Sequence, residues 1–216
     1  MNILLFPGSF SPYTDGHYGI VARYISAARK KDIKIDKVVI IISSKEREGI
    51  DTKSVYKFVS RLYSNDNRFE IRLSGEKGPI SEVYKYVNIR ASENKETVNY
   101  IFVRSNKDDD TAADDFNRSF GKGGKYELDN VKVIELDNVS DSPLLYKNRG
   151  DNKDGKPISA STVREDIRNN DFDKFLKSYQ IIRKSEITID KKYLQKCFDK
   201  WKKEIKKDSI LNFEQN

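Results

Sequence analysis

The residues best suited to chemistry lie near the start of the chain, in residues 6–20, which read FPGSFSPYTDGHYGI. They include His17, the single histidine of the 216 residues. The pattern predicts a buried strand, a turn in which Gly8 lets the backbone approach a ligand, and a helix that begins near residues 15–17. The first N–H groups of a helix are unpaired and partly positive, so this junction favours an anion. Thr14 and His17 are three residues apart and can reach the same helix start, where His17 could donate a hydrogen bond to phosphate.

An isolated histidine also has a simpler interpretation, a capped helix in which a neighbouring group satisfies the ring. For this stretch, that interpretation must also explain the turn and the strand before it. Ligands of open α/β sheets bind at the carboxyl ends of the strands, and this junction is one such end.

A second candidate stretch, residues 155–175, reads GKPISASTVREDIRNNDFDKF. Ser159 or Ser161 can cap a helix there, with hydroxyls and unpaired N–H groups facing an anion. Arg164 lies one turn into that helix and can point back at its start, which suits a clamp for a triphosphate tail. Taken alone, the spacing Ser-x-Ser-Thr-x-x-Arg is weak and favours a simple capped surface helix.

The elements that must position these residues follow from the hydrophobic periodicity. Short β-branched runs alternate with amphipathic helical stretches, and five of these runs are candidate strands: residues 2–6, 37–43, 69–73, 99–104 and 131–136. Continuous apolar runs are typical of buried parallel strands, and strand–helix alternation is typical of a doubly wound sheet. The sequence therefore predicts an α/β protein with a Rossmann-like, doubly wound, parallel five-stranded sheet and a C-terminal helical extension.

The domain boundary is expected near residue 180, between a domain at 1–180 and a basic amphipathic helical tail at 181–216. Two long polar connections interrupt the first domain, at 105–130 and 138–157, and such loops are typically functional lids or mobile. The first is expected to hold a short helix near 112–120. In the tail, a helix is expected near 190–207, and its apolar residues form one stripe: Leu194, Cys197, Phe198, Trp201 and Ile205. Core packing is favoured over a cofactor contact for this stripe.

The net charge of +7 is concentrated in the tail, because residues 181–207 hold ten Lys or Arg and four Asp or Glu. A basic tail on a nearly neutral body indicates a docking element, for a second subunit or a protein partner, more than a nucleic-acid-binding domain. Cys197 cannot form an internal disulfide, and one cysteine with one histidine cannot surround zinc. Any metal should be a hard cation that arrives with a substrate.

No membrane association is expected, since the longest aliphatic run, VVIII at 38–42, is far too short to span a bilayer. No secretory segment is expected to precede it, and a cytoplasmic protein is predicted.

Together, the two stretches resemble a known family. GSFSPYTDGH resembles the first signature of the nucleotidyltransferase superfamily, often written His/Thr-x-Gly-His, whose members include cytidylyltransferases and the phosphopantetheine and nicotinamide mononucleotide adenylyltransferases. ISASTVR resembles the late signature Ile-Ser-x-Ser/Thr-x-Val/Ile-Arg, and NNDFDKF after it is similar to phage-encoded members. The resemblance covers residues 1–179, and the Thr14–His17 form is most similar to the phosphopantetheine branch. Ser11 stands where the family usually has aspartate.

The resemblance implies transfer of a nucleoside monophosphate from ATP or CTP to a phosphorylated small molecule, with Mg²⁺ on the phosphates and release of pyrophosphate. The implied catalytic residues are His17, Thr14 and Arg164. His17 would stabilise the reacting α-phosphoryl group rather than act as a base, Thr14 would help to hold the α- and β-phosphates, and Arg164 would help to hold the β- and γ-phosphates. The implied nucleotide-binding residues are Gly8, Ser9, Phe10, Gly16, Ser159, Ser161 and Thr162. Lys45, Arg104 and Ser11 are weaker candidates for the acceptor, and each of the two cations is equally well explained as a solvated loop residue.

Two functions therefore stay open at this point. The first is an active enzyme, with the adenylyl direction slightly favoured. The second is a phage-encoded protein that keeps the fold in a structural or scaffolding role in the virion, with little or no catalysis.

Overall fold

The structure is a computed structural model that describes residues 1–103, 111–136, 158–186 and 188–214. The described residues before 137 form nine elements: β1 Asn2–Gly8, α1 Asp15–Lys30, β2 Lys37–Ile42, α2 Thr52–Leu62, β3 Phe69–Leu73, α3 Pro79–Glu93, β4 Val98–Phe102, α4 Ala112–Phe120 and β5 Val131–Val133. In the described residues after 157, the structure has four helices: α6 Ala160–Arg168, α7 Phe172–Lys177, α8 Gln180–Ser185 and α9 Lys191–Glu214. Among the described residues, no helix combines the length and the apolar character needed to cross a bilayer.

The five strands form one parallel sheet in the order β3-β2-β1-β4-β5. β1 lies at its centre, and Ile3 pairs in register with Lys37 of β2 and with Tyr100 of β4. Consecutive residues of β1 and β2 point to opposite faces of the sheet and are all buried from Ile3 to Phe6 and from Val38 to Ile42, so both faces are covered, which explains their continuous apolar runs. The predicted α/β fold with a parallel five-stranded sheet and C-terminal helices is confirmed. The last strand is shorter than predicted, because it ends at Val133.

Contacts divide the chain into two compact units. The sheet unit comprises residues 1–8, 20–44 and 66–142, and the helical unit comprises residues 9–19, 45–65 and 143–216. The predicted boundary near residue 180 does not coincide with this division, because the contacts group the C-terminal helices with residues 9–19 and 45–65. Whether 1–180 folds without the tail stays a prediction.

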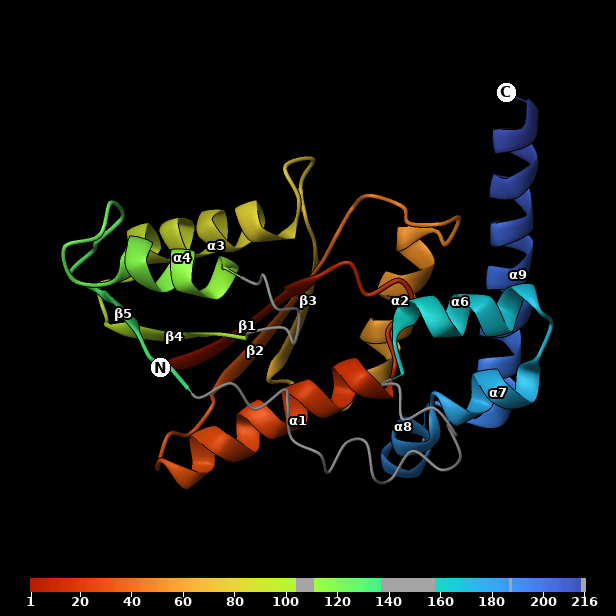
Figure 1. Ribbon diagram of the computed structural model, residues 1–216. Helices are drawn as coiled ribbons and strands as arrows, with labels where there is room; N and C mark the ends of the chain where they lie inside the picture. The colour runs from red at the N-terminus through yellow and green to blue at the C-terminus, as the bar shows by residue number, and fades with distance from the viewer. Residues whose placement is uncertain (104–110, 137–157, 187, 215–216) are drawn as a thin grey trace. The chain divides into compact units, whose positions relative to one another are not determined.

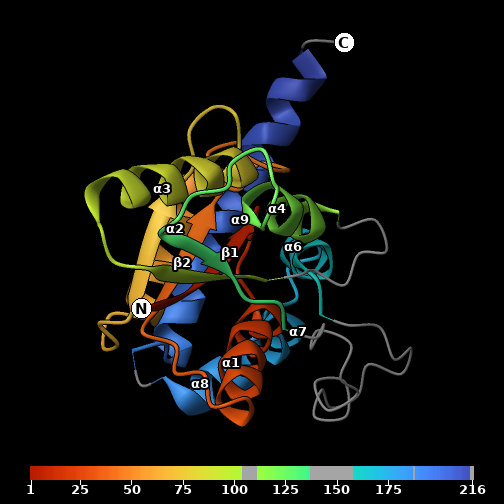
Figure 2. The same cartoon turned by 90° about the vertical axis from the view of Figure 1, so that its left-hand side faces the viewer.

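Within the sheet unit, α3 and α4 pack on the same face of the sheet, as Figures 1 and 2 show. Alternate strand residues such as Ile3 and Leu5 point to this face, since strand side chains alternate with a period of two. The part of α1 from Ile20 onward lies on the opposite face (Figure 2) and buries Val21 and Tyr24. Along the chain, the carboxyl end of β1 leads directly into the first motif.

The helical unit has an aromatic core to which the tail contributes. The ring of Trp201 packs against Phe58 of α2 and Phe175 of α7, and its indole Nε1 donates to Ser54 Oγ at 3.2 Å. Four residues of the predicted tail stripe are buried, while Cys197 is half-buried. The prediction that this stripe is core packing is therefore confirmed.

Candidate functional site

The first motif forms a tight loop that leads into α1. Phe10, in the helical unit, has a left-handed backbone with φ of 49°, which is uncommon for a bulky residue and marks a strongly constrained turn. The centroids of the Phe10 and Tyr13 rings each lie 5.2 Å from that of the His17 imidazole. The Phe10 and Tyr13 centroids are themselves 5.5 Å apart, so the three rings form one cluster that restricts the orientation of the histidine ring.

Hydrogen bonds from Thr14 fix the proton position on this ring. His17 Nδ1 accepts the backbone N–H of Thr14 at 3.1 Å and lies 3.1 Å from the Thr14 hydroxyl. A ring nitrogen that accepts an N–H carries no proton, so the neutral imidazole holds its proton on Nε2. The Nε2–H group is the donor that a phosphate contact requires. Thr14 is fully buried, so its side chain serves to position His17.

Asp15 has a role that the sequence did not reveal. Its carboxylate accepts the backbone N–H groups of Ile181 at 2.8 Å and Ile182 at 3.0 Å, and its own N–H donates to the Ser178 carbonyl at 3.1 Å. The N-cap residue of α8, Tyr179, gives no side-chain cap, so Asp15 caps this helix from a distant part of the sequence. The first motif is thereby attached to the tail.

The late motif forms the start of α6 (Figure 1). Of the two predicted caps, Ser159 is the one used: its Oγ accepts the Thr162 N–H at 3.2 Å. The same oxygen lies 2.7 Å from Ser161 Oγ and 3.0 Å from Thr162 Oγ1. Ser161 is exposed and the other two residues are half-buried. Three hydroxyls thus gather at a helix start whose first N–H groups favour an anion.

Arg164 connects the two motifs. Its side chain is only 2% exposed; Nη1 donates to the Ser11 carbonyl, and Nη2 donates to Glu48 Oε1 at 2.5 Å. Arg168 Nη2 donates to the other Glu48 oxygen at 2.7 Å. Pairing with Arg164, and next with Arg168, lowers the pKa of the Glu48 carboxyl from 4.5 to about 2. Arg164 is therefore bound to the loop before α1 and to Glu48, rather than directed only at the start of its own helix.

Glu48 is a site residue that sequence reasoning missed. Its backbone is left-handed, with φ of 51°, and Gly49 follows with φ of 80°. A Cβ on Gly49 would lie 2.7 Å from Asp208 Cβ and 2.9 Å from Ile205 Cα, so only glycine allows the loop to approach α9 this closely. α9 thereby holds the loop that carries Glu48. The glycine after a charged run was the one local signal of this turn.

Tyrosines around the first motif are unsuited to acid–base chemistry near neutral pH. The hydroxyls of Tyr13 and Tyr63 lie 2.7 Å apart in the interior, and Tyr18 donates to Glu186 Oε1 at 3.0 Å. Burial is the main cause that raises the pKa of all three phenols. Their contribution is to hold the loop in place.

The remaining predicted site residues are placed as follows. Gly8 ends β1 in the sheet unit, where its carbonyl accepts the Ser43 N–H at 2.9 Å. Ser9 and Gly16 are half-buried, and Lys45 is exposed, all in the helical unit. Arg104 lies outside the described residues. Within the part of the chain that the structure describes, no group of three or more His, Cys, Asp or Glu is placed to hold a metal ion.

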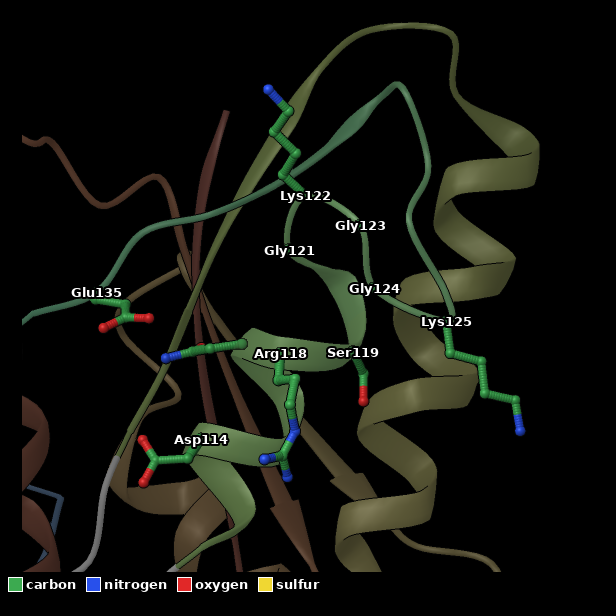
Figure 3. Close-up of a pocket in the computed structure, with 10 residues that line it drawn as sticks. Asp114, Arg118, Ser119, Gly121, Lys122, Gly123, Gly124, Lys125 and Glu135 are labelled. Atoms are coloured by element: carbon green, nitrogen blue, oxygen red, sulfur yellow. The ribbon is translucent and has the colours of Figure 1, made fainter.

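Two cavities in the sheet unit contain none of the predicted site residues. One, of about 660 Å³, lies where α4 ends, and Figure 3 shows its Lys122 and Lys125 side chains extending in different directions. Asp114 and Glu135 also line it, so its charges are mixed and its cations do not converge. The other, of about 380 Å³, is lined by Ile25, Arg29, residues 32–35 and Arg68.

The protein therefore belongs to the α/β class, with a Rossmann-like parallel sheet. The starts of α1 and α6, which carry the polar side chains of the two motifs, both belong to the helical unit. In comparisons with known proteins, the chain matches no family model and no curated sequence.

Proposed function

We propose that the protein is a nucleotidyltransferase that transfers a nucleoside monophosphate from a nucleoside triphosphate to a phosphorylated small molecule. The observation that carries the proposal is the hydrogen bond from Arg164 to the Ser11 carbonyl. It ties the start of α6 to the loop that leads into α1, so two groups of anion-favouring donors are connected through one buried side chain.

His17 acts on the reacting phosphorus in this proposal. A phosphate oxygen of the acceptor attacks the α-phosphorus, the bond from that phosphorus to the bridging oxygen breaks, and pyrophosphate leaves with the electron pair. The Nε2–H of His17 donates to a non-bridging α-phosphate oxygen as it gains negative charge. No covalent enzyme intermediate forms, so rate enhancement comes from positioning and charge stabilisation.

The start of α6 holds the leaving group in this proposal. The hydroxyls of Ser159, Ser161 and Thr162 and the first N–H groups of the helix bind the β- and γ-phosphates. Mg²⁺ arrives on these phosphates and neutralises part of their charge. ATP is slightly favoured over CTP by the resemblance of the first motif, and Lys45, Ser11 and Arg104 are proposed for the acceptor.

A second function, a scaffold that keeps the fold without catalysis, is favoured by one specific observation. Asp15 and Arg164, the charged residues of the two motifs, are both bound by protein groups. A structural protein needs no more from these motifs than such internal contacts. It predicts no nucleotide binding at millimolar concentration.

Two substitutions of His17 separate these functions. His17→Asn places an oxygen near Nδ1, which keeps an acceptor for the Thr14 N–H, but it removes the Nε2–H donor. His17→Gln provides a donor near Nε2 and loses that acceptor. Pyrophosphate release is measured with ATP and CTP against a panel of phosphorylated acceptors, and thermal unfolding is measured in parallel.

The proposal predicts that His17→Asn lowers kcat by about 10²–10³ without changing the unfolding temperature. His17→Gln should unfold at lower temperature and keep more of the activity. A wild-type rate in His17→Asn would show that the ring is only a cap acceptor, and the enzymatic role of His17 would be wrong.

A further inference from the structure

The Glu48 carboxylate bridges two arginines of α6 that are four residues apart. Arg164 is 2% exposed, while Glu48 and Arg168 are 41% and 45% exposed. One side of this cluster is therefore buried and the other faces solvent. An anion that arrives from solution could reach the place now taken by the carboxylate without any opening of the core.

The carboxylate leaves one donor of this cluster unused. Arg164 Nε lies on the same edge of the guanidinium as Nη2, and in the described part of the chain this buried atom has no hydrogen-bond partner. The buried Ser11 Oγ also has none among the described residues. Arg164 Nε and Nη2 with Arg168 Nη2 make three donors, whereas a carboxylate has two oxygens and divides them between the two arginines. A terminal phosphate has three oxygens, and guanidinium groups bind it with the same fork geometry as a carboxylate.

We infer that Glu48 is an internal substitute for a phosphate group, and that a terminal phosphate of the nucleotide replaces it between Arg164 and Arg168. The inference rests on the proposed function and names Glu48 and Arg168 as further residues of that site. An unpaired buried charge is costly, so Arg164 needs an anion at all times, and Glu48 provides it when no phosphate is bound.

The loop around Glu48 is built for such an exchange. Gly49 packs closely against α9, and the Asp51 N–H donates to Glu204 Oε2 of α9 at 3.2 Å. These two contacts hold the main chain of the loop in place. The Glu48 side chain is 41% exposed, so it can rotate into solvent when another anion takes its place. Its low pKa keeps it ionised at neutral pH, so it competes with phosphate rather than becoming neutral.

The test uses sodium tripolyphosphate as the probe, with binding measured by calorimetry on the full chain. Glu48→Gln removes the competing charge, and Glu46→Gln is the matched control, because it makes the same charge change in the same exposed loop. If Glu48 occupies the site nine-tenths of the time, Glu48→Gln should bind tripolyphosphate about tenfold more tightly than wild type. Glu46→Gln should bind like wild type.

Stability provides a second readout. Glu48→Gln should unfold at lower temperature than wild type, because Arg164 loses its counter-charge, and tripolyphosphate should raise its unfolding temperature more than that of wild type. Adding Arg168→Gln to Glu48→Gln should abolish the gain in affinity. If Glu48→Gln does not fold, Glu48→Asp keeps the charge but is too short to bridge both arginines, and it should also bind more tightly.

The outcomes distinguish the inference from the proposed function. If wild type binds tripolyphosphate and the Glu48 variants bind it equally or more weakly, Glu48 is only an ion-pair partner; the inference is overturned and the proposed function stands. If wild type and the variants all fail to bind tripolyphosphate, the phosphate site is absent and both proposals are overturned.

Discussion

The two motif helices, α1 and α6, each bury a carboxylate, but the two carboxylates differ in their hydrogen-bond partners. Asp15 of α1 is 1% exposed and accepts two backbone N–H groups of α8. Asp166 of α6 is 8% exposed, and no described residue donates a hydrogen bond to its carboxylate. Burial, and next the negative charge of Asp171, raises the pKa of Asp166 to about 6. The Asp15 carboxylate therefore stabilises the start of α1, whereas the ionised Asp166 carboxylate lowers the stability of the folded protein.

The largest expected effect on stability comes from removing the Asp15 carboxylate, which connects α1 to α8. Asp15→Ala leaves two N–H groups of α8 without a partner, and we expect a loss of about 3 kcal/mol in the free energy of unfolding, measured in urea. Asp190→Ala is the control, because it removes an exposed cap at the start of α9 that accepts the Tyr193 N–H at 2.7 Å. That cap should contribute about 1 kcal/mol. Equal losses in the two variants would show that Asp15 is an ordinary surface cap.

A smaller effect of opposite sign is expected in α6. A carboxyl whose pKa is raised on folding destabilises the protein only when it is ionised, so the cost is absent below pH 4, grows through pH 6 and is constant above. Asp166→Asn should therefore raise the free energy of unfolding by about 1 kcal/mol at pH 7, and the gain should vanish near pH 4. A gain that is independent of pH, or a loss at pH 7, would contradict this comparison.

The same contrast explains what the sequence could and could not predict. The strands were predictable because buried parallel strands require long apolar runs, and α4 has the bounds that were predicted, 112–120. Apolar residue type is a weaker guide within α3, because Ile80 is 38% exposed whereas Tyr86 is buried. Ile80 lies in the first turn of this helix, which begins at Pro79.

In the site, the residues with local signals were found, and those with distant partners were not. The cap of α6 follows from a serine three residues before a threonine. Asp15 and Glu48, by contrast, bind partners that are 166 and 116 residues away, and spacing along one helix carries no information on such pairs. The charge of the tail led to the prediction of a separate docking element. In the structure, Trp201 of the tail packs in the core of the helical unit, and α9 contacts the loop that carries Glu48.

The central claim, that His17 touches phosphate, can be tested directly because the chain has one histidine and its imidazole signals need no assignment. Long-range ¹H–¹⁵N NMR reports the tautomer and the environment of each ring nitrogen. We predict a proton on Nε2 before nucleotide is added, and a clear change in the Nε2 shift, with Nδ1 little altered, when ATP or CTP with Mg²⁺ reaches saturation. Imidazole signals that stay unchanged at millimolar concentrations of every nucleoside triphosphate would contradict the account.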